Sequence, residues 1–144
     1  MTASPDRREQ ILQLLHGLGN RISPRFERCT GISSTRFEIL HELCQAEELN
    51  QSMLQKAIQV DSAAITRHLK QLEADGVVTR RRNPEDNRIT FVRLTEEGRA
   101  RIDGYRKEKN NLIQQVMHNF SDEEITRLAQ YLERLQNNMD ERFS

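Results

Sequence analysis

Apolar residues recur at intervals of three and four along most of the chain, which is the spacing of one face of an α-helix. They predict a first helix that begins at Pro5, with Ser4 as its N-cap, and ends near Thr30. Ser33 or Ser34 is expected to cap a second helix. The predicted buried positions of that helix are Phe37, Leu40, Leu43 and Cys44.

The next two helices are predicted to form a tight helix-turn-helix. The first of them is short and follows a polar stretch at 47–50. Only residues 59–61 separate it from the second, 62–75, for which Asp61 is a good N-cap and Gly76 a good terminator. One face of the second helix carries Ile65, Leu69 and Leu72, and the opposite face carries Ala63, Thr66, Arg67 and Lys70.

A change of period from helical to alternating follows this helix. Segments 77–82 and 88–95 alternate in polarity with a period of two, which favours β-strands. The five residues 83–87 between them include Pro84 and Asp86, which are typical of turns. We therefore expect a β-hairpin with an exposed tip.

The C-terminal part of the chain is predicted to be helical again. Thr95 should cap a long fifth helix, and Ser121 to Glu124 form a capping box that opens a sixth. Apolar residues of the sixth helix follow one another at intervals of three and four, at Ile125, Leu128, Leu132, Leu135 and Met139. Residues 11, 15, 18 and 22 repeat this spacing, which is that of a coiled-coil contact, so both terminal helices need another helix to face.

Composition points to the same kind of protein. Hydrophobic residues make up 35% of the 144 residues and there is no Trp, so one subunit has little apolar material for a thick core. We predict a mainly α fold: a winged helix-turn-helix with about six helices and a small β-hairpin wing, in which helices from both termini form a dimerisation region.

Charge and segment composition exclude several classes of protein. The 22 basic and 22 acidic residues balance, so bulk charge alone would not hold the chain on nucleic acid. No apolar run exceeds three residues, which excludes a membrane span or a secretory signal in this sequence and leads us to expect a cytoplasmic protein. Two cysteines in a reducing compartment do not suggest a disulfide framework.

The order of the central elements favours binding to duplex DNA. A helix enters the major groove only if its outer face is slim, which Ser62, Ala63 and Thr66 permit. Arg67 is predicted to reach a guanine edge or a phosphate, and Lys70 a phosphate.

The hairpin supplies the second predicted contact. Arg88 near its tip can enter the adjacent minor groove. The remaining hairpin arginines, predicted as backbone anchors that cannot all face DNA because strands alternate, are Arg80, Arg81, Arg82 and Arg93. A basic hairpin is often only a solvated edge, and a helix-turn-helix pattern can arise by chance, but their consecutive order favours DNA binding.

The stretch from Ile65 to Gly98 resembles the central block of the MarR family, the multiple antibiotic resistance regulators. The family's wing signature, D-x-R-x-x-x-V-x-L-T, matches at Asp86, Arg88, Val92, Leu94 and Thr95. The other helices agree with the family in order and approximate length, so the resemblance covers nearly the whole chain.

The resemblance implies an obligate homodimer with interleaved terminal helices, bound to a pseudo-palindromic duplex. Residues 1–144 would form one unit, with 33–95 as the winged helix-turn-helix and 1–30 and 96–144 as dimerisation helices. It further implies that Asp86 positions Arg88, and that the protein is a repressor relieved by a small phenolic or other anionic effector. The complete set of predicted DNA-binding residues is Ser62, Ala63, Thr66, Arg67, Lys70, Arg80, Arg82, Asp86 and Arg88.

Two alternatives remain open within the same sequence. Cys29, beside Arg28 near a helix end, is a candidate redox sensor, whereas Cys44 is expected to pack. A helical protein-interaction module without DNA binding would explain the terminal heptads but not the arginine hairpin. His41 and Cys44 lack further metal ligands at suitable spacing, and no motif indicates a cofactor or an enzyme.

Overall fold

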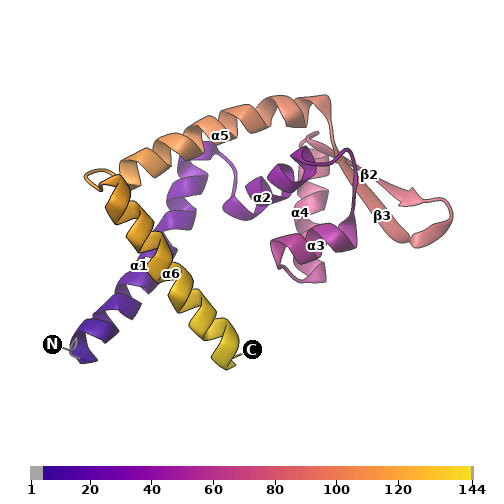
Figure 1. The fold of residues 1–144 in the computed structure, drawn as a ribbon. Coiled ribbons are helices and arrows are strands. Elements are labelled where there is room, and N and C mark those ends of the chain that lie inside the picture. Colours follow the sequence, from indigo (N-terminus) through magenta and orange to yellow (C-terminus); the bar gives the residue numbers. More distant parts are fainter. Residues whose placement is uncertain (1–4, 144) are drawn as a thin grey trace. The chain divides into compact units, whose positions relative to one another are not determined.

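The computed structural model describes residues 5–143, so the predicted cap Ser4 lies outside the described residues. Within them the chain forms six helices and a three-stranded antiparallel sheet, which confirms the predicted fold class (Figure 1). The elements in chain order are α1 (Pro5–Thr30), α2 (Ser34–Cys44), β1 (Leu49–Asn50), α3 (Gln51–Ile58), α4 (Ser62–Ala74), β2 (Val78–Asn83), β3 (Asp86–Leu94), α5 (Glu96–Val116) and α6 (Asp122–Phe143). They fall into two compact units, Met1–Lys109 and Asn110–Ser144, which we describe separately.

The core of the first unit is formed by α2, α3, α4 and the sheet. The side chains with no exposed surface include Ile39, Leu40, Leu43, Leu54, Ile65, Leu69 and Val92. Each fully buried Leu or Ile contributes roughly 1.5–3 kcal/mol relative to an exposed one. Burial is confirmed for Phe37, Leu40 and Leu43, whereas Cys44 is only half-buried, and Ile39 is a core residue that the predicted set omitted.

The helix-turn-helix forms where the sequence predicts it. Gln59 ends α3 in the left-handed region, with a φ of 61°. The Asp61 carboxylate accepts a hydrogen bond from the Ala64 amide at 2.7 Å and so caps α4. Gly76, with a φ of 79°, follows α4 in a conformation that glycine adopts without steric cost.

The sheet adds one strand to the predicted hairpin and corrects the predicted length of its turn. The polar stretch before α3 contributes a short strand, β1, and the strand order is β1-β3-β2. The predicted five-residue connection is also too long, because the strands extend to Asn83 and Asp86 and leave only two residues between them. The Asn83 side chain accepts a hydrogen bond from the Glu85 amide at 2.9 Å, which stabilises this tighter turn.

Thr95 joins the hairpin to α5, as its predicted role as a cap requires. Its hydroxyl accepts a hydrogen bond from the Gly98 amide at 3.0 Å and donates one to the Gly76 carbonyl at 2.7 Å. Gly98 lies so close to the backbone of Val77 that a Cβ atom there would overlap the Val77 carbonyl oxygen. The end of the hairpin is therefore locked to the end of α4 by backbone contacts.

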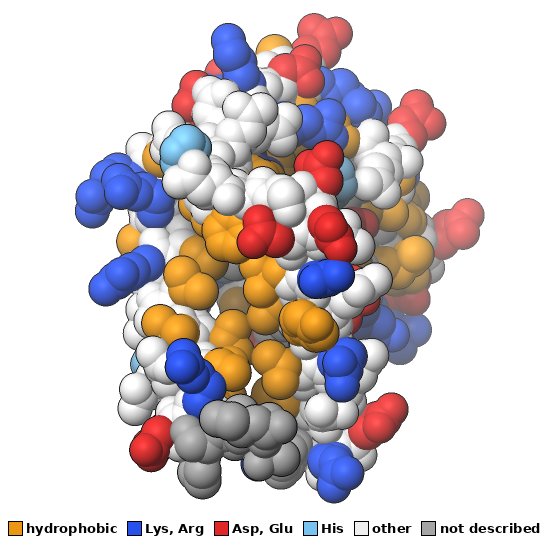
Figure 2. Space-filling model, turned by 60° about the vertical axis from the view of Figure 1, so that its left-hand side comes forward, with side chains coloured by type: hydrophobic (Ala, Val, Ile, Leu, Met, Phe, Trp, Pro, Cys, Tyr) orange, Lys and Arg blue, Asp and Glu red, His pale blue; other side chains and the backbone are white. Residues whose placement is uncertain are grey.

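Helix α1, in the same unit, leaves much of its apolar face uncovered. Ile11, Leu14, Leu18 and Ile22 are all exposed, and only Phe26 near the C-terminal end is buried. Figure 2 shows hydrophobic side chains uncovered at the surface of the single chain, among charged ones. None of the described helices is long and apolar enough to cross a membrane.

The second unit contains the end of α5 and the whole of α6. The predicted capping box is confirmed, because the Ser121 hydroxyl accepts from the Glu124 amide at 3.1 Å and the Glu124 carboxylate accepts from the Ser121 amide at 2.9 Å. Several large apolar side chains of α6 are exposed in the single chain: Tyr131, Leu132, Leu135 and Met139.

Candidate nucleic-acid interface

The outer face of α4 is small, basic and open. Arg67 and Lys70 are exposed on the side opposite the buried Ile65 and Leu69. A shallow surface hollow of about 560 Å³ lies along this face, lined by Ser62, Ala63, Thr66, Arg67, Lys70 and Gln71. The structure therefore brings together all five residues predicted on this helix, and their contact with DNA remains a prediction.

Thr66 is tied to the neighbouring helix. Its hydroxyl donates a hydrogen bond to the Ser62 carbonyl at 2.9 Å and accepts one from the Gln51 side-chain amide at 3.3 Å. Gln51 starts α3, so this contact fixes the beginning of α3 beside the outer face of α4. Gln51 was absent from the predicted site, because sequence spacing gives no sign of a contact between residues 15 apart.

His68 connects α4 to α2. The Arg36 side chain donates from Nε to His68 Nδ1 at 3.2 Å, a contact that requires an unprotonated acceptor nitrogen. Burial lowers the pKa of His68 below its ordinary value of 6.5, and the positive charges of Arg36 and Arg67 lower it further. The neutral imidazole thus holds α4 against α2 directly beside Arg67.

The tip of the hairpin presents Arg88. Its side chain is 90% exposed, and Asp86 holds it on one side. Asp86 Oδ1 accepts from the Arg88 Nε at 3.0 Å and from its backbone amide at 3.1 Å, while Oδ2 accepts from Nη2 at 3.2 Å. These hydrogen bonds lower the pKa of the Asp86 carboxyl. The geometry is that of an extended cation whose direction is set by its neighbour.

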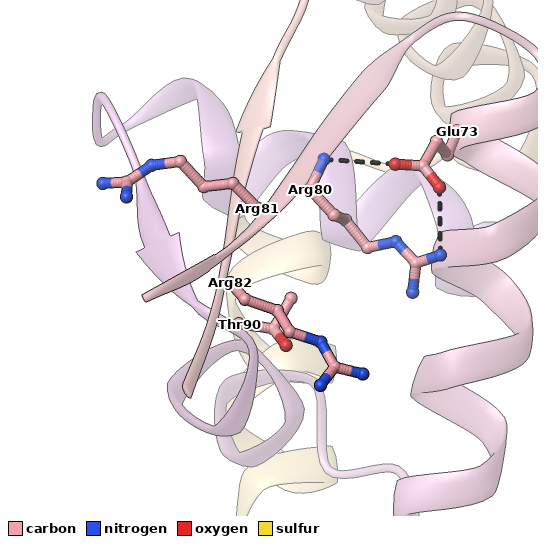
Figure 3. Close-up of a pocket in the computed structure, with 5 residues that line it drawn as sticks. All are labelled: Glu73, Arg80, Arg81, Arg82 and Thr90. Carbon is pink, nitrogen blue, oxygen red and sulfur yellow. Dashed lines mark hydrogen bonds and ion pairs between the residues drawn. The ribbon is translucent and has the colours of Figure 1, made fainter. Parts of the chain in front are cut away.

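The consecutive arginines of β2 point to opposite faces of the sheet, as strand alternation predicts. Figure 3 shows Arg80 and Arg82 on one side of the strand and Arg81 on the other. A hollow of about 270 Å³ lies beside them, lined also by Glu73 and Thr90.

Two of these arginines are engaged in ion pairs. Arg80 binds Glu73 of α4, and Arg81 binds Glu48, which precedes β1. In each case the hydrogen bond from the arginine side chain is the main cause that lowers the pKa of the glutamate. Arg82 and Arg93 take part in no ion pair within the described part of the chain.

A cluster of aromatic and basic side chains lies where α2 and α5 approach each other within the first unit. His41 stacks on Phe37, with ring centroids 6.3 Å apart, and its Nδ1 lies 3.4 Å from Arg106 Nη2. The Lys109 ammonium lies 4.9 Å from the centroid of the Phe37 ring, and Phe26 of α1 packs edge-on against that ring. The buried Phe37 ring thus packs against side chains from α1, α2 and α5.

The cysteines and metal-binding residue types do not assemble a site in residues 5–143. Cys29 is exposed, Cys44 is half-buried, and both are free thiols. No group of three or more His, Cys, Asp or Glu side chains in this range is arranged to hold a metal ion.

Comparison with known proteins agrees with the observed elements. The model of the MarR family matches residues 32–90. YdgJ of Bacillus subtilis (strain 168), an uncharacterised HTH-type transcriptional regulator, is 51% identical over 131 residues, which are 91% of this chain and 80% of that protein. YetL of the same strain, an HTH-type transcriptional repressor, is 35% identical over 122 residues, which are 81% and 73% of the two chains.

Solved structures share the fold. The crystal structure of a mutant MarR from E. coli complexed with operator DNA has a TM-score of 0.79 and 24% sequence identity, and the match covers 93% of this chain and 99% of that chain. Together with the sequence relatives, the element order and the wing signature identify this chain as a member of the MarR family of helix-turn-helix transcriptional regulators.

Proposed function

We propose that the protein is a homodimeric repressor that binds a pseudo-palindromic duplex and releases it when a small anionic effector binds. The observation that carries this proposal is the combination, on one compact unit, of a slim basic face on α4 and an exposed arginine at the tip of the adjoining hairpin. The repressor YetL and the operator complex of E. coli MarR support it as relatives in sequence and fold.

In the proposed complex, α4 lies in the major groove. The small side chains of Ser62 and Ala63 let the helix approach the bases, Arg67 reaches a guanine edge, and Lys70 binds a phosphate. Because the Thr66 hydroxyl is already hydrogen-bonded, we propose that Thr66 acts through its methyl group, which suits the methyl of thymine.

The hairpin makes the second contact, in the adjacent minor groove. Arg88 is long, flat and directed by Asp86, so little conformational entropy is lost when it enters the groove. Arg82 is the strand arginine that we propose for a phosphate contact, since the described residues leave it without an ion pair. In the proposed dimer, the two copies of α4 and the hairpin would bind half-sites about 10 base pairs apart.

The proposed effector site is the cluster of His41, Arg106 and Lys109 around Phe37. The Phe37 ring is buried against Phe26, His41 and Lys109, so a small anion such as a hydroxybenzoate would pair through its carboxylate with Arg106 and Lys109 on α5. The cluster joins α2 to α5, so a bound effector would alter the contacts between these two helices.

DNA binding is tested with the variant Arg88→Ala and a duplex covering the DNA upstream of the protein's own gene. We expect its affinity to fall roughly tenfold or more, because a desolvated groove contact is lost. The control Arg99→Ala removes another exposed arginine, from α5, and should leave the affinity within twofold, about 0.4 kcal/mol.

Equal affinities for the parent and Arg88→Ala at matched salt would contradict the assignment of the wing. A parent protein that ignores both this duplex and a random one in low salt would favour the alternative of a protein-interaction module. Loss of DNA binding on oxidation that Cys29→Ser abolishes would favour the redox alternative.

The effector proposal is tested by thermal unfolding with hydroxybenzoic acids. At ten times its Kd, a ligand of the folded state stabilises it by about 1.4 kcal/mol, so the melting temperature should rise. Lys109→Met retains the length of the side chain and removes its charge, and it should reduce the rise. An unchanged rise in that variant would place the anion elsewhere.

A further inference from the structure

Arg80 and Arg81, adjacent on β2, tie the hairpin to two other elements in opposite directions. We call the Glu73–Arg80 pair the inner clasp and the Glu48–Arg81 pair the outer clasp. The sequence favoured Arg80 as an anchor to the DNA backbone, so its engagement with a carboxylate of the same chain calls for a different role.

The inner clasp joins the hairpin to α4, the helix that we propose enters the major groove. Glu73 Oε1 accepts from Arg80 Nη2 at 3.0 Å, and Oε2 accepts from the Arg80 backbone amide at 3.2 Å (Figure 3). The Arg80 side chain is only 21% exposed, and its Nε is buried without a hydrogen-bond partner among the described residues. Arg80 lies opposite Val92 in the sheet, a residue with no exposed surface, so it belongs to the inner face. This arginine is largely covered and has its carboxylate partner within the same chain.

The outer clasp crosses the opposite face of the sheet. Arg81 donates from Nε and Nη2 to the two oxygens of Glu48 at 3.0 and 2.8 Å, a bidentate pair of defined orientation. Its guanidinium carbon lies 4.6 Å from the centroid of the Phe91 ring on the central strand β3. Glu48 directly precedes β1, so the contact spans all three strands.

Both clasps act at the middle of β2, where Arg80 and Arg81 are the two central residues. Ion pairs that solvent still reaches stabilise a fold very little, so a role in overall stability would not account for two of them on consecutive residues. Carboxylates near a DNA-binding face also repel phosphates, which gives each glutamate a cost for binding. The inner clasp does, however, restrict how the hairpin is oriented relative to α4, and the outer clasp ties it to the segment that precedes β1.

We propose that Glu73 and Glu48 are positioning residues that set the orientation of the wing, so that Arg88 and α4 reach their grooves together, with Arg80 and Arg81 as their partners rather than as phosphate ligands. This inference rests on the proposed DNA-binding function. It specifies a determinant of that function outside the residues that touch DNA.

The sign of a charge-removing substitution tests the proposal. Glu73→Ala and Glu48→Ala each remove a negative charge and free an arginine, so electrostatics alone would strengthen binding to the upstream duplex. If the clasps position the wing, affinity should instead fall, by roughly threefold to tenfold. Glu85→Ala is the matched control, because Glu85 is exposed at the hairpin turn and forms no ion pair within residues 5–143. Its affinity should stay equal or rise.

A double-mutant cycle measures the coupling between Glu73 and Arg88 in DNA affinity, which general destabilisation of the fold would not change. In the parent, Arg88→Ala should weaken binding, whereas in the Glu73→Ala background the same change should cost much less, because Arg88 is no longer directed into its groove. Additive losses, or tighter binding by Glu73→Ala, would overturn the proposal and restore Arg80 as a DNA contact masked by its carboxylate.

Hydrogen exchange on the free protein separates this inference from the proposed function. Backbone amides of residues 81–90 should exchange faster in Glu73→Ala and Glu48→Ala than in the parent and in Glu85→Ala. Unchanged exchange would overturn the positioning role whether or not DNA binds. Failure of the parent to bind any duplex would contradict the proposed function, and the exchange experiment would still decide whether the clasps hold the hairpin.

Discussion

His68 is a residue of α4 whose protonation in mild acid would change the charge of that helix. It accepts a hydrogen bond from Arg36 through Nδ1, and it lies beside Arg67 on the same helix. Protonation would remove the acceptor and place a third positive charge between two arginines. The same physical causes that lower the pKa of His68 therefore make its protonation disruptive.

The expected consequence is a loss of stability in mild acid. Because the pKa of His68 is lowered on folding, the unfolded chain takes up a proton first, and the stabilisation that is complete above pH 6.5 is lost as the pH falls through the folded-state pKa. His68→Gln, whose side-chain oxygen can still accept from Arg36, should lose less melting temperature than the parent between pH 7.5 and 5.5. His118→Gln, an exposed control, should behave like the parent, and equal losses in all three proteins would refute the role of His68.

Residue roles were predictable from the sequence where the partner lies close in the chain. Asp61, Thr95 and the Ser121 to Glu124 box act as the caps that their spacing indicates. The pairs Arg36 with His68 and Glu48 with Arg81 were not predictable, since 32 and 33 residues separate the partners and only the folded chain brings them together. For the same reason, sequence patterns assigned the strand arginines to DNA without showing that two of them are engaged.

Among the elements, α4 depends on its N-terminal cap. The Asp61 carboxylate satisfies the Ala64 amide, and its negative charge is favourable at the positive end of the helix. The first turn of α4 also carries Ser62 and Ala63, the residues expected to enter the groove. The cap therefore links helix stability to DNA binding.

Asp61→Ala should lower the free energy of unfolding by about 1 kcal/mol, because the Ala64 amide loses its partner. Denaturant unfolding measures this loss, and DNA affinity should fall with it. Asp61→Ser keeps a capping oxygen and should recover most of the loss. If Asp61→Ala and Asp61→Ser unfolded at the same denaturant concentration as the parent, the cap would not stabilise α4.

Helical periodicity predicted all six helices, because each carries a continuous apolar stripe that is buried or left exposed in the single chain. It did not predict β1, since two residues are too few to show alternation and the strand exists only because β3 offers it hydrogen bonds. The turn was predicted too long because Pro84 and Asp86 both favour turns, whereas pairing of Asn83 with Asp86 extends the strands.

At the scale of the whole molecule, the exposed apolar faces of α1 and α6 are the feature that a single chain leaves unexplained. Ile11, Leu18 and Ile22 of α1 and Leu132 and Leu135 of α6 are each at least 39% exposed. Apolar faces with this spacing, which we call seams, are buried when another helix packs against them. A second copy of this chain offers the same seams and is the partner that the proposed dimer supplies.

Leu135→Glu should therefore convert the dimer into monomers. It places a charge in the α6 seam, where burial without a partner costs several kcal/mol. Light scattering should give twice the 16.9 kDa of the chain for the parent at micromolar concentration and one chain mass for the variant. Gln136→Glu adds the same charge at the neighbouring exposed position, away from the seam, and should remain dimeric.

Loss of the dimer should also distinguish binding to a single half-site from binding to the full palindrome. A monomer keeps α4 and the hairpin, so its weak, salt-sensitive binding to a single half-site should persist, whereas the affinity for the full palindrome should fall by roughly a hundredfold or more because the second half-site no longer binds intramolecularly. The melting temperature of the parent should rise with protein concentration, as it does whenever folding is coupled to association. A Leu135→Glu protein that retained the parent's mass and its affinity for the full site would show that the α6 seam is not where the two copies meet.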